Sequence, residues 1–239
     1  MHVIRENIVE EAAIDYRFLL DRGYSRNDAL SLVAKRYGLT PVERMALYRG
    51  VHRSFESSTI FAKIVNPVNF VLDKLVIDMY NTVITIVAAL RGQPLVLGDD
   101  CLVRDLRGSK LHHSEYSLLE DAIHLLSLEI AVFRPKSVVV VAESQISHSA
   151  EQAVALCRCI EALGVRCTKI VTPTVDSTIV KISDSACVVA TTDTVIALRV
   201  PHIYPLTTVV ALKRMRVKPS IDFSRILRSP CRPLVERLV

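Results

Sequence analysis

Apolar residues recur along the 239-residue chain in two different patterns, which divide it into parts. In residues 1–66 they recur every three or four positions, the spacing of one face of an α-helix. In residues 67–212 short unbroken apolar runs alternate with longer amphipathic stretches, as buried strands alternate with helices. Residues 213–239 contain three prolines and predict extended or short helical structure. We therefore predict a helical N-terminal domain over 1–66, an α/β domain over 67–212 and a C-terminal tail over 213–239.

Three helices are predicted in the N-terminal domain. The first covers residues 6–20 and carries an apolar stripe. The second begins at Ser25, a residue type that caps helix N-termini, and ends at Gly38. The third begins at Thr40, which has capping-box spacing to Glu43.

Residues 29–51 also have the spacing of a helix–turn–helix unit with Gly38 in its turn, and such a unit would present basic side chains to phosphate. Packing against the next domain is the alternative, and it is favoured because helix pairs with a glycine turn are common. With the basic residues near the tail, the candidate nucleic-acid-binding residues are Lys35, Arg36, Arg44, Arg49, Arg214, Arg216 and Lys218.

The second domain is expected to be a mainly parallel sheet flanked by helices, a Rossmann-like three-layer α/β fold. Its apolar runs predict strands at residues 75–77, 137–142, 166–171 and 186–190, and a final edge strand at 202–206. Amphipathic stretches predict helices at residues 114–133 and 149–163, and residues 174–181 predict a short helix or a turn. Residues 95–105 predict a hairpin that turns at residues 98–100.

Missing motifs exclude several classes of protein. The seven glycines form neither a phosphate-binding P-loop nor a dinucleotide fingerprint, and no Gly-x-Ser-x-Gly elbow occurs. The six cysteines form no Cys-x-x-Cys pair, so we expect most to be small buried residues, with a disulfide as the alternative in a hyperthermophile. No apolar run is long enough to span a membrane, and the charged N-terminus is unlike a signal peptide. We expect a soluble cytoplasmic protein without a membrane partner.

The net charge of +5 is unevenly distributed. Residues 67–212 hold 12 Lys and Arg against 15 Asp and Glu, whereas residues 213–239 hold eight against two. An acidic centre beside a basic surface suits a metal site with an anionic substrate. A solvated basic tail is the alternative and, taken alone, the more common case.

Acids follow several of the predicted strands. Asp78, Glu143 and Asp193 stand at strand ends, and Asp176 lies in the loop beyond another strand. Since ligands of open α/β sheets bind at the carboxyl ends of strands, we expect these carboxylates to converge on Mg²⁺ or Mn²⁺. Asn81, one turn after Asp78, is placed to orient a carboxylate or a water. Each acid alone would more often be structural, as a helix cap or loop residue, and the same holds for the additional candidates Asp100 and Asp105.

Three short motifs carry a family resemblance. Val76-Ile-Asp78-x-x-Asn81, Val175-Asp176-Ser-x-Ile179 and Ala190-Thr-Thr-Asp193 resemble the PIN/NYN superfamily of metal-dependent ribonucleases over residues 72–206. The whole chain resembles a family of uncharacterised archaeal proteins that join a small helical domain to such an α/β domain. The resemblance implies that Asp78, Asp176 and Asp193 hold the metal, and Glu143 matches only by its place.

Two departures from the superfamily pattern accompany this likeness. Met79 stands where the superfamily often has glycine, and Val195 stands where a second aspartate is common. The leading hypothesis is a Mg²⁺- or Mn²⁺-dependent ribonuclease or related phosphodiesterase that acts on RNA. One alternative is a non-catalytic RNA- or DNA-binding module on a degenerate nuclease fold. The other is an interaction protein whose acids are structural, and a homodimer is left open.

Overall fold

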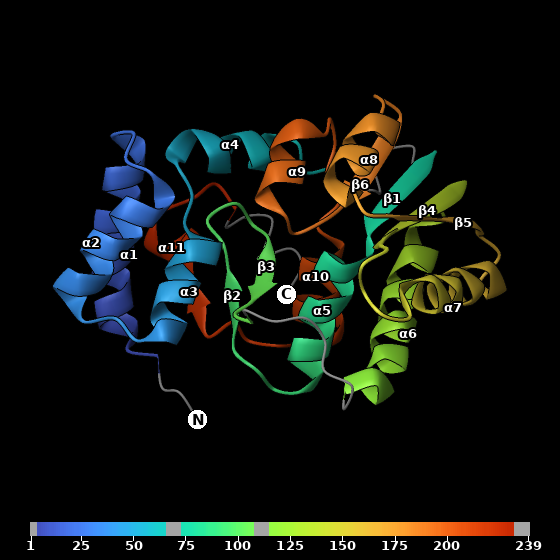
Figure 1. The fold of residues 1–239 in the computed structure, drawn as a ribbon, viewed down its shortest axis with the longest axis horizontal. Helices are drawn as coiled ribbons and strands as arrows, with labels where there is room; N and C mark the ends of the chain where they lie inside the picture. The colour runs from blue at the N-terminus through green and yellow to red at the C-terminus, as the bar shows by residue number, and fades with distance from the viewer. Residues whose placement is uncertain (1–3, 66–72, 108–114, 232–239) are drawn as a thin grey trace.

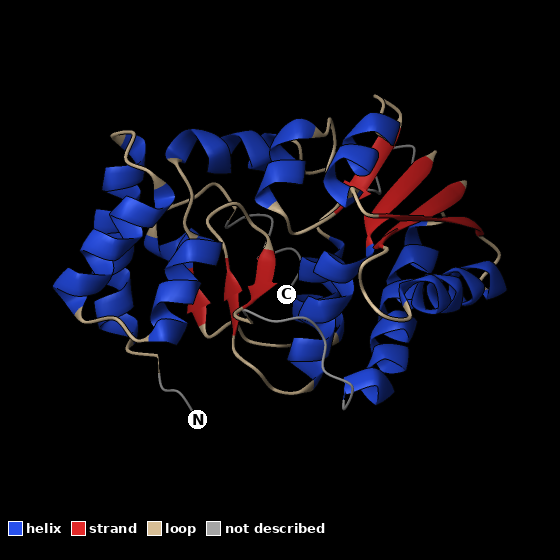
Figure 2. Ribbon diagram, viewed as in Figure 1, coloured by secondary structure: helices blue, strands red, loops and turns tan. Residues whose placement is uncertain are grey.

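The structure is a computed structural model and describes residues 4–65, 73–107 and 115–231. Helices of the N-terminal part lie at one end, a four-stranded sheet lies at the other, and a small three-stranded sheet lies between them (Figures 1 and 2). The predicted domain boundary at residues 66–67 falls outside the described residues. The predicted class, an α/β fold with a parallel sheet and a helical N-terminal region, is confirmed.

The N-terminal helices are α1 (Glu6–Asp21), α2 (Arg26–Tyr37), α3 (Pro41–Gly50) and α4 (Ser54–Ala62). The predicted caps are present. The Ser25 side chain accepts a hydrogen bond from the Asp28 amide, and Thr40 and Glu43 form a reciprocal capping box. Glu43 is buried and also accepts hydrogen bonds from the Arg5 side chain, which holds its pKa at about 2. Local sequence signals therefore set the ends of α2 and α3.

The four-stranded sheet is wholly parallel and runs in the order β5–β4–β1–β6. Its strands are β1 (Lys74–Asp78), β4 (Ser137–Glu143), β5 (Arg166–Thr172) and β6 (Cys187–Ala190). The chain steps outward from β1 through β4 to β5 and then returns to place β6 on the other side of β1. Strand order therefore reverses between β1 and β6, and such a switch point is the usual ligand crevice of open α/β sheets.

Helices cover both faces of this sheet (Figure 2). Alternate residues of β1 face opposite ways: Leu75 and Ile77 join one apolar cluster, and Val76 joins another. The first cluster includes residues of α5 (Met79–Leu90), α6 (Tyr116–Phe133), α7 (Ser149–Ala162), α10 (Leu206–Val209) and the π-helix η2 (Val210–Arg214). The second includes residues of α4, α8 (Val175–Ile182) and α9 (Thr194–Arg199). Both faces are buried, as the unbroken apolar run predicted.

The small sheet connects the C-terminal part of the chain to the N-terminal helices. The predicted hairpin forms from β2 (Leu95–Leu97) and β3 (Val103–Asp105), and β7 (Ile221–Asp222) pairs with β2 in parallel. Val96, Ile221 and Phe223 pack in one apolar cluster with residues of α1, α2 and α3. Phe223 begins α11 (Phe223–Ile226) and lies so close to α3 that a Cβ atom at Gly50 would be 2.3 Å from its ring. The C-terminal segment is therefore part of the N-terminal core.

The strand predicted at residues 202–206 is wrong. Only Ile203 makes β-bridges there, one to Ile64 and one to Val189. Pro201 precedes this stretch and Pro205 lies within it, and both lack the backbone N–H that a longer ladder needs. Two isolated bridges at one residue therefore replace the expected edge strand. The predicted start of the α6 helix at residue 114 falls outside the described residues.

The expectation that most cysteines are small buried residues is confirmed, since Cys101, Cys157, Cys187 and Cys231 are buried. The disulfide alternative also applies, to four of the six cysteines. Cys101 is joined to Cys231 by a disulfide, and Cys157 of α7 is joined to Cys167 of β5. Cys159 and Cys187 are free. Spacing along the chain concealed both pairs, because the partners are 130 and 10 residues apart.

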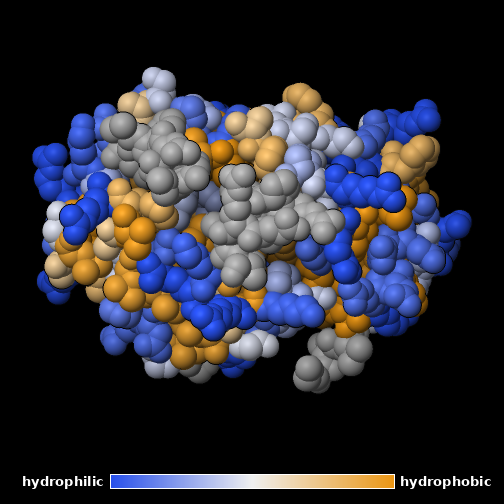
Figure 3. Space-filling model, turned by 180° about the vertical axis from the view of Figure 1, so that it is seen from behind, coloured by the Kyte–Doolittle hydropathy of each residue, from blue (hydrophilic) through white to orange (hydrophobic). Residues whose placement is uncertain are grey.

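No helix among the described residues combines the length and apolar character needed to cross a membrane. Seen from behind, hydrophilic and hydrophobic side chains are interspersed over the coloured surface (Figure 3). The large exposed apolar side chains are spread over different elements, as with Phe18 on α1, Phe55 on α4 and Val132 on α6.

Candidate functional site

Asp78 lies at the switch point of the sheet, where β1 ends and α5 begins. Its side chain is 2% exposed. One carboxylate oxygen, Oδ2, accepts a hydrogen bond of 2.7 Å from Asn81 Nδ2 and another of 2.7 Å from Thr191 Oγ1. The other oxygen, Oδ1, accepts no hydrogen bond from the described residues, and Asp78 does not cap α5. The carboxylate is thus fixed through one oxygen, and the other has no hydrogen-bond partner among the described residues.

The surroundings of Asp78 oppose its ionisation. Burial is the main cause that raises its pKa to about 6, and the charges of Asp193 and Asp176 raise the pKa further. The hydrogen bonds from Asn81 and Thr191 act in the opposite direction because they stabilise the carboxylate. A cation would relieve the same repulsion.

A cavity of about 260 Å³ opens beside Asp78. Asn81 lines it from the first turn of α5, Glu143 from the end of β4, and Asp176 from the first turn of α8. Burial and the charge of Asp193 raise the pKa of Asp176, while Arg199 lowers it. The structure therefore brings four of the sequence candidates to one cavity at the carboxyl edge of the sheet.

Asp193 lies on the other side of Asn81. It follows β6 and caps α9, since its Oδ1 accepts from the backbone amides of Val195 and Ile196. It lines a second cavity of about 310 Å³, which Asn81 also lines. Thr191 joins the two sites, because its hydroxyl donates to Asp78 and accepts from the Asp193 amide at 3.0 Å. Asp193 thus has a structural role as well as a place beside the other acids.

The four acids are near enough to affect one another's pKa but do not close into a tight cluster. Among the described residues, one group of three potential metal ligands has its ligand atoms within 4.8 Å of one another, and that group is His52, Asp99 and Asp100. The site around Asp78 is therefore an open arrangement of carboxylates.

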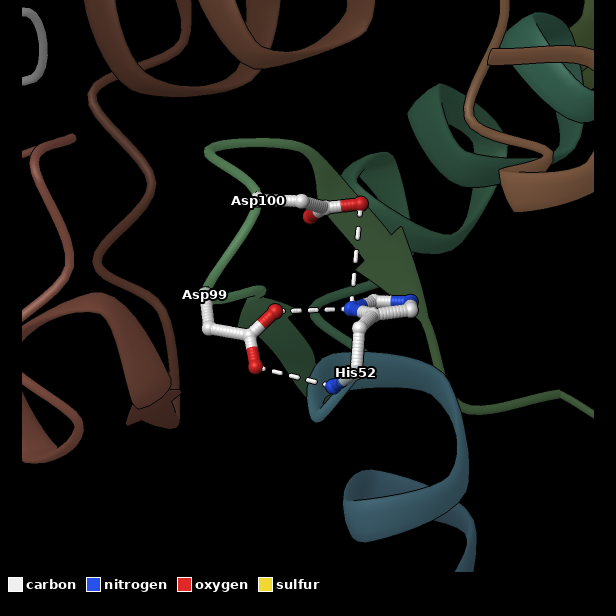
Figure 4. A group of neighbouring side chains, drawn as sticks. All are labelled: His52, Asp99 and Asp100. Carbon is white, nitrogen blue, oxygen red and sulfur yellow. Dashed lines mark hydrogen bonds and ion pairs between the residues drawn. The ribbon is translucent and has the colours of Figure 1, made fainter. Parts of the chain in front are cut away.

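The group of His52, Asp99 and Asp100 is fully buried (Figure 4). His52 Nδ1 lies 2.7 Å from Asp99 Oδ1 and 3.9 Å from Asp100 Oδ2. Both carboxylates have cationic partners, Asp99 in Arg17 and Asp100 in Arg104. Burial alone would raise the pKa of Asp100, but Arg104, His52 and the Leu102 amide together outweigh it and hold the pKa at about 2. Two arginines already balance the two carboxylates, so the group needs no metal.

This buried network reaches the loop after β6. Arg104 Nε donates to the Thr192 carbonyl oxygen at 2.7 Å, and His52 Nε2 lies 3.0 Å from Thr194 Oγ1. Both contacts flank Asp193. The hairpin and the residues between α3 and α4 therefore fix the loop that carries one candidate acid.

The additional candidates and the basic candidates lie apart from the Asp78 cavity. Asp100 is paired as described above, and Asp105 accepts from Arg49 Nη1 at 3.1 Å and from Thr85 Oγ1 at 3.0 Å. Most basic candidates are dispersed over the surface: Lys35 is exposed, Arg36 pairs with Asp15, Arg214 pairs with Glu129, and Arg216 and Lys218 line a cavity beside β7. Arg49 lines the cavity that Asp193 also lines, and Arg44 lines a different cavity.

Sequence reasoning missed the supporting residues of the site. The motif at residues 190–193 did not reveal that the Thr191 hydroxyl anchors Asp78. It did not single out Arg104 or His52. The one available signal was the spacing of Asp100 and Arg104, which are four residues apart and form an ion pair across the hairpin.

Comparison with known proteins gives two family matches. Residues 69–209 match a family described as a domain of unknown function (DUF5616), and residues 8–63 match one described as a protein of unknown function (DUF434). The chain is 32% identical over 143 residues to an uncharacterized protein of Methanocaldococcus jannaschii, MJ0935. That alignment covers 59% of this chain and 67% of the relative. No solved structure matches the chain. The predicted likeness to uncharacterised archaeal proteins is thus confirmed, and the PIN/NYN likeness stays a prediction.

Proposed function

The chain belongs to the family described as a domain of unknown function (DUF5616), and we propose that it is a Mg²⁺- or Mn²⁺-dependent nuclease that cleaves RNA. One observation carries the proposal. A buried carboxylate at the switch point of a parallel sheet has one oxygen that no described residue hydrogen-bonds, and two further acids line the cavity beside it. The PIN/NYN-like motifs predict the same residues.

The donor set fits a hard, hydrated cation. Every candidate ligand is a carboxylate or amide oxygen, the type that Mg²⁺ and Mn²⁺ prefer. Mg²⁺ usually keeps several waters and takes one or two carboxylates, which suits acids that are not in mutual contact. Burial chiefly raises the pKa of Asp78 and of Asp176, and neighbouring acids raise both further, so a bound cation would stabilise the ionised carboxylates.

Each residue has a distinct role in this proposal. Asp78 offers its free oxygen to the metal, while Asn81 and Thr191 hold its other oxygen in place. Asp176 and Asp193 supply further negative charge from either side, and Glu143 orients a water in the cavity. When bound, the cation would lower the pKa of a water and neutralise phosphate charge. The carboxylates would repel an RNA phosphate until that charge is balanced.

Cleavage assays test the proposal. Labelled single-stranded RNA is incubated with wild type and Asp78→Asn in Mg²⁺, Mn²⁺ or EDTA. We expect wild type to cleave with metal only, and Asp78→Asn to lose cleavage but retain RNA binding. Asp184→Asn is the matched control, because Asp184 is largely exposed and precedes β6 at the opposite edge of the sheet.

Three results would decide against the nuclease. Cleavage that survives both EDTA and Asp78→Asn would come from a contaminant. An equal loss of cleavage in Asp184→Asn would make the effect non-specific. Metal-independent RNA binding without cleavage of any RNA tested would instead favour a non-catalytic binding module.

A further inference from the structure

Three cavities lie in a row that begins at the carboxylates. The cavity beside Asp78 shares Asn81 with the second cavity, of about 310 Å³. The second shares Tyr48 with a third, of about 240 Å³, between α2 and α3. Shared lining residues make each cavity the neighbour of the next. We call this row the track.

The far part of the track is cationic and carries an aromatic ring. Arg26 and Arg49 line the second cavity, and Arg44 lines the third. The side chain of Arg44 makes no hydrogen bond or ion pair with the described residues. Arg49 also forms an ion pair with Asp105. Glu56 and Asp193 add negative charge to the lining of the second cavity. The residues that line the track thus change from mainly acidic at the Asp78 cavity to basic at the third cavity.

Tyr48 stands between the second and third cavities. It is 41% exposed, and the Arg26 guanidinium lies 5.1 Å from the centre of its ring. Arg26 is held in turn by the backbone carbonyl oxygens of Tyr48 and Val51. The ring is therefore a supported, partly exposed aromatic surface of the kind on which nucleic-acid bases stack.

We propose that the track binds single-stranded nucleic acid and leads it from the carboxylates to the surface between α2 and α3. A base stacks on Tyr48, and Arg26, Arg44 and Arg49 contact the neighbouring phosphates. A single strand is favoured over a duplex because duplex bases have no free face to offer the ring. What happens at the acidic end rests on the proposed nuclease function, whereas the binding role of the track does not.

Two pairs of variants test the track. Tyr48→Ala is matched by Phe18→Ala, since Phe18 is 56% exposed, carries the Arg22 guanidinium at 5.1 Å and lines a cavity that shares no lining residue with the track. Arg44→Gln is matched by Lys169→Gln. Lys169 is exposed on β5, at the opposite end of the molecule from α2 and α3 (Figure 1).

Affinities are measured by fluorescence anisotropy in EDTA, so that binding is separated from cleavage. The probes are a labelled 12-nucleotide RNA, a DNA of the same sequence and a 12-base-pair RNA duplex. Tyr48→Ala should weaken binding of both single strands about tenfold, the lower end of what one base stack contributes. Arg44→Gln should reduce the slope of log affinity against log salt by about 1. Phe18→Ala and Lys169→Gln should bind like wild type, and thermal melts verify that all four fold.

Several results would overturn the track. The first is that Tyr48→Ala and Arg44→Gln both bind nucleic acid as tightly as wild type. The second is that Phe18→Ala loses as much affinity as Tyr48→Ala. The third is that the protein binds the duplex as tightly as the single strands. Cleavage with Mn²⁺ separates the two proposals. If wild type cleaves RNA and both variants keep its KM, the track is wrong while the nuclease stands. If nothing is cleaved but the variants lose affinity as expected, the track stands alone.

Discussion

Replacing Asp78 by asparagine should stabilise the protein at neutral pH. Folding raises the pKa of Asp78 from 3.8 to about 6, chiefly through burial, so the folded state disfavours the carboxylate. At about 1.4 kcal/mol per pKa unit, the ionised side chain costs about 3 kcal/mol of stability. Asparagine has nearly the same shape, cannot ionise, and keeps an oxygen that accepts from Thr191. We expect Asp78→Asn to recover a large part of this free energy.

The pH dependence identifies the cause. The unfolded carboxyl ionises first, so the wild type loses stability from this group as pH rises from 3.8 to about 6. Below that interval the group is protonated in both states, and above it the cost is complete. The stability difference between variant and wild type should therefore be near zero at about pH 3.5 and reach about 3 kcal/mol at about pH 7.

Urea unfolding from pH 3.5 to 8 in EDTA provides the measurement, with Asp184→Asn as the control. The same unfolding measurement is then repeated with added Mn²⁺, which should stabilise the wild type far more than Asp78→Asn. A variant less stable than wild type at neutral pH would refute the reasoning. So would a stability difference that stays constant between pH 4 and 7.

Three further predictions follow from contacts described above. Thr191→Val removes a hydrogen bond to a charged group worth about 1.5–3 kcal/mol, so the pKa of Asp78 and the pH midpoint of Mn²⁺ binding should rise by about 1–2 pH units in a calorimetric titration. Gly50→Ala places a Cβ atom 2.3 Å from the Phe223 ring and should cost about 1–3 kcal/mol in urea unfolding. Cys231→Ser removes the Cys101–Cys231 disulfide, which closes the longer loop, and should cost up to about 5 kcal/mol of stability, against about 3 kcal/mol for loss of Cys157–Cys167. A reductant should therefore lower the melting temperature of wild type more than that of the variant, in which the Cys101–Cys231 bond is already absent.

The arrangement of the sheet was predictable because apolar runs and acids recur together. Parallel strands end at one edge, so Asp78, Glu143 and Asp176 had to lie near one another once each run was recognised as a strand. The capping residues Ser25 and Thr40 act within one helical turn, so the starts of α2 and α3 were also predictable from the sequence.

The rest depends on contacts between distant parts of the chain. Asp99 looked like a turn residue, yet it is buried and paired with Arg17, which lies 82 positions away. Tyr48 is 41% exposed and lines a cavity together with Asn81 and Asp193, which lie far from it in the sequence. Spacing along the chain encodes neither relation.

The contact between Phe223 and α3 also constrains the order in which the protein is made. Gly50 leaves the ribosome 173 residues before Phe223 does. At about 5–20 residues per second, α1, α2 and α3 wait roughly ten to thirty seconds for the side chain that completes their core. During that interval their apolar faces are open to other proteins in the cell. These helices are therefore synthesised well before their core is complete, and a chaperone that binds nascent chains would meet them in that state.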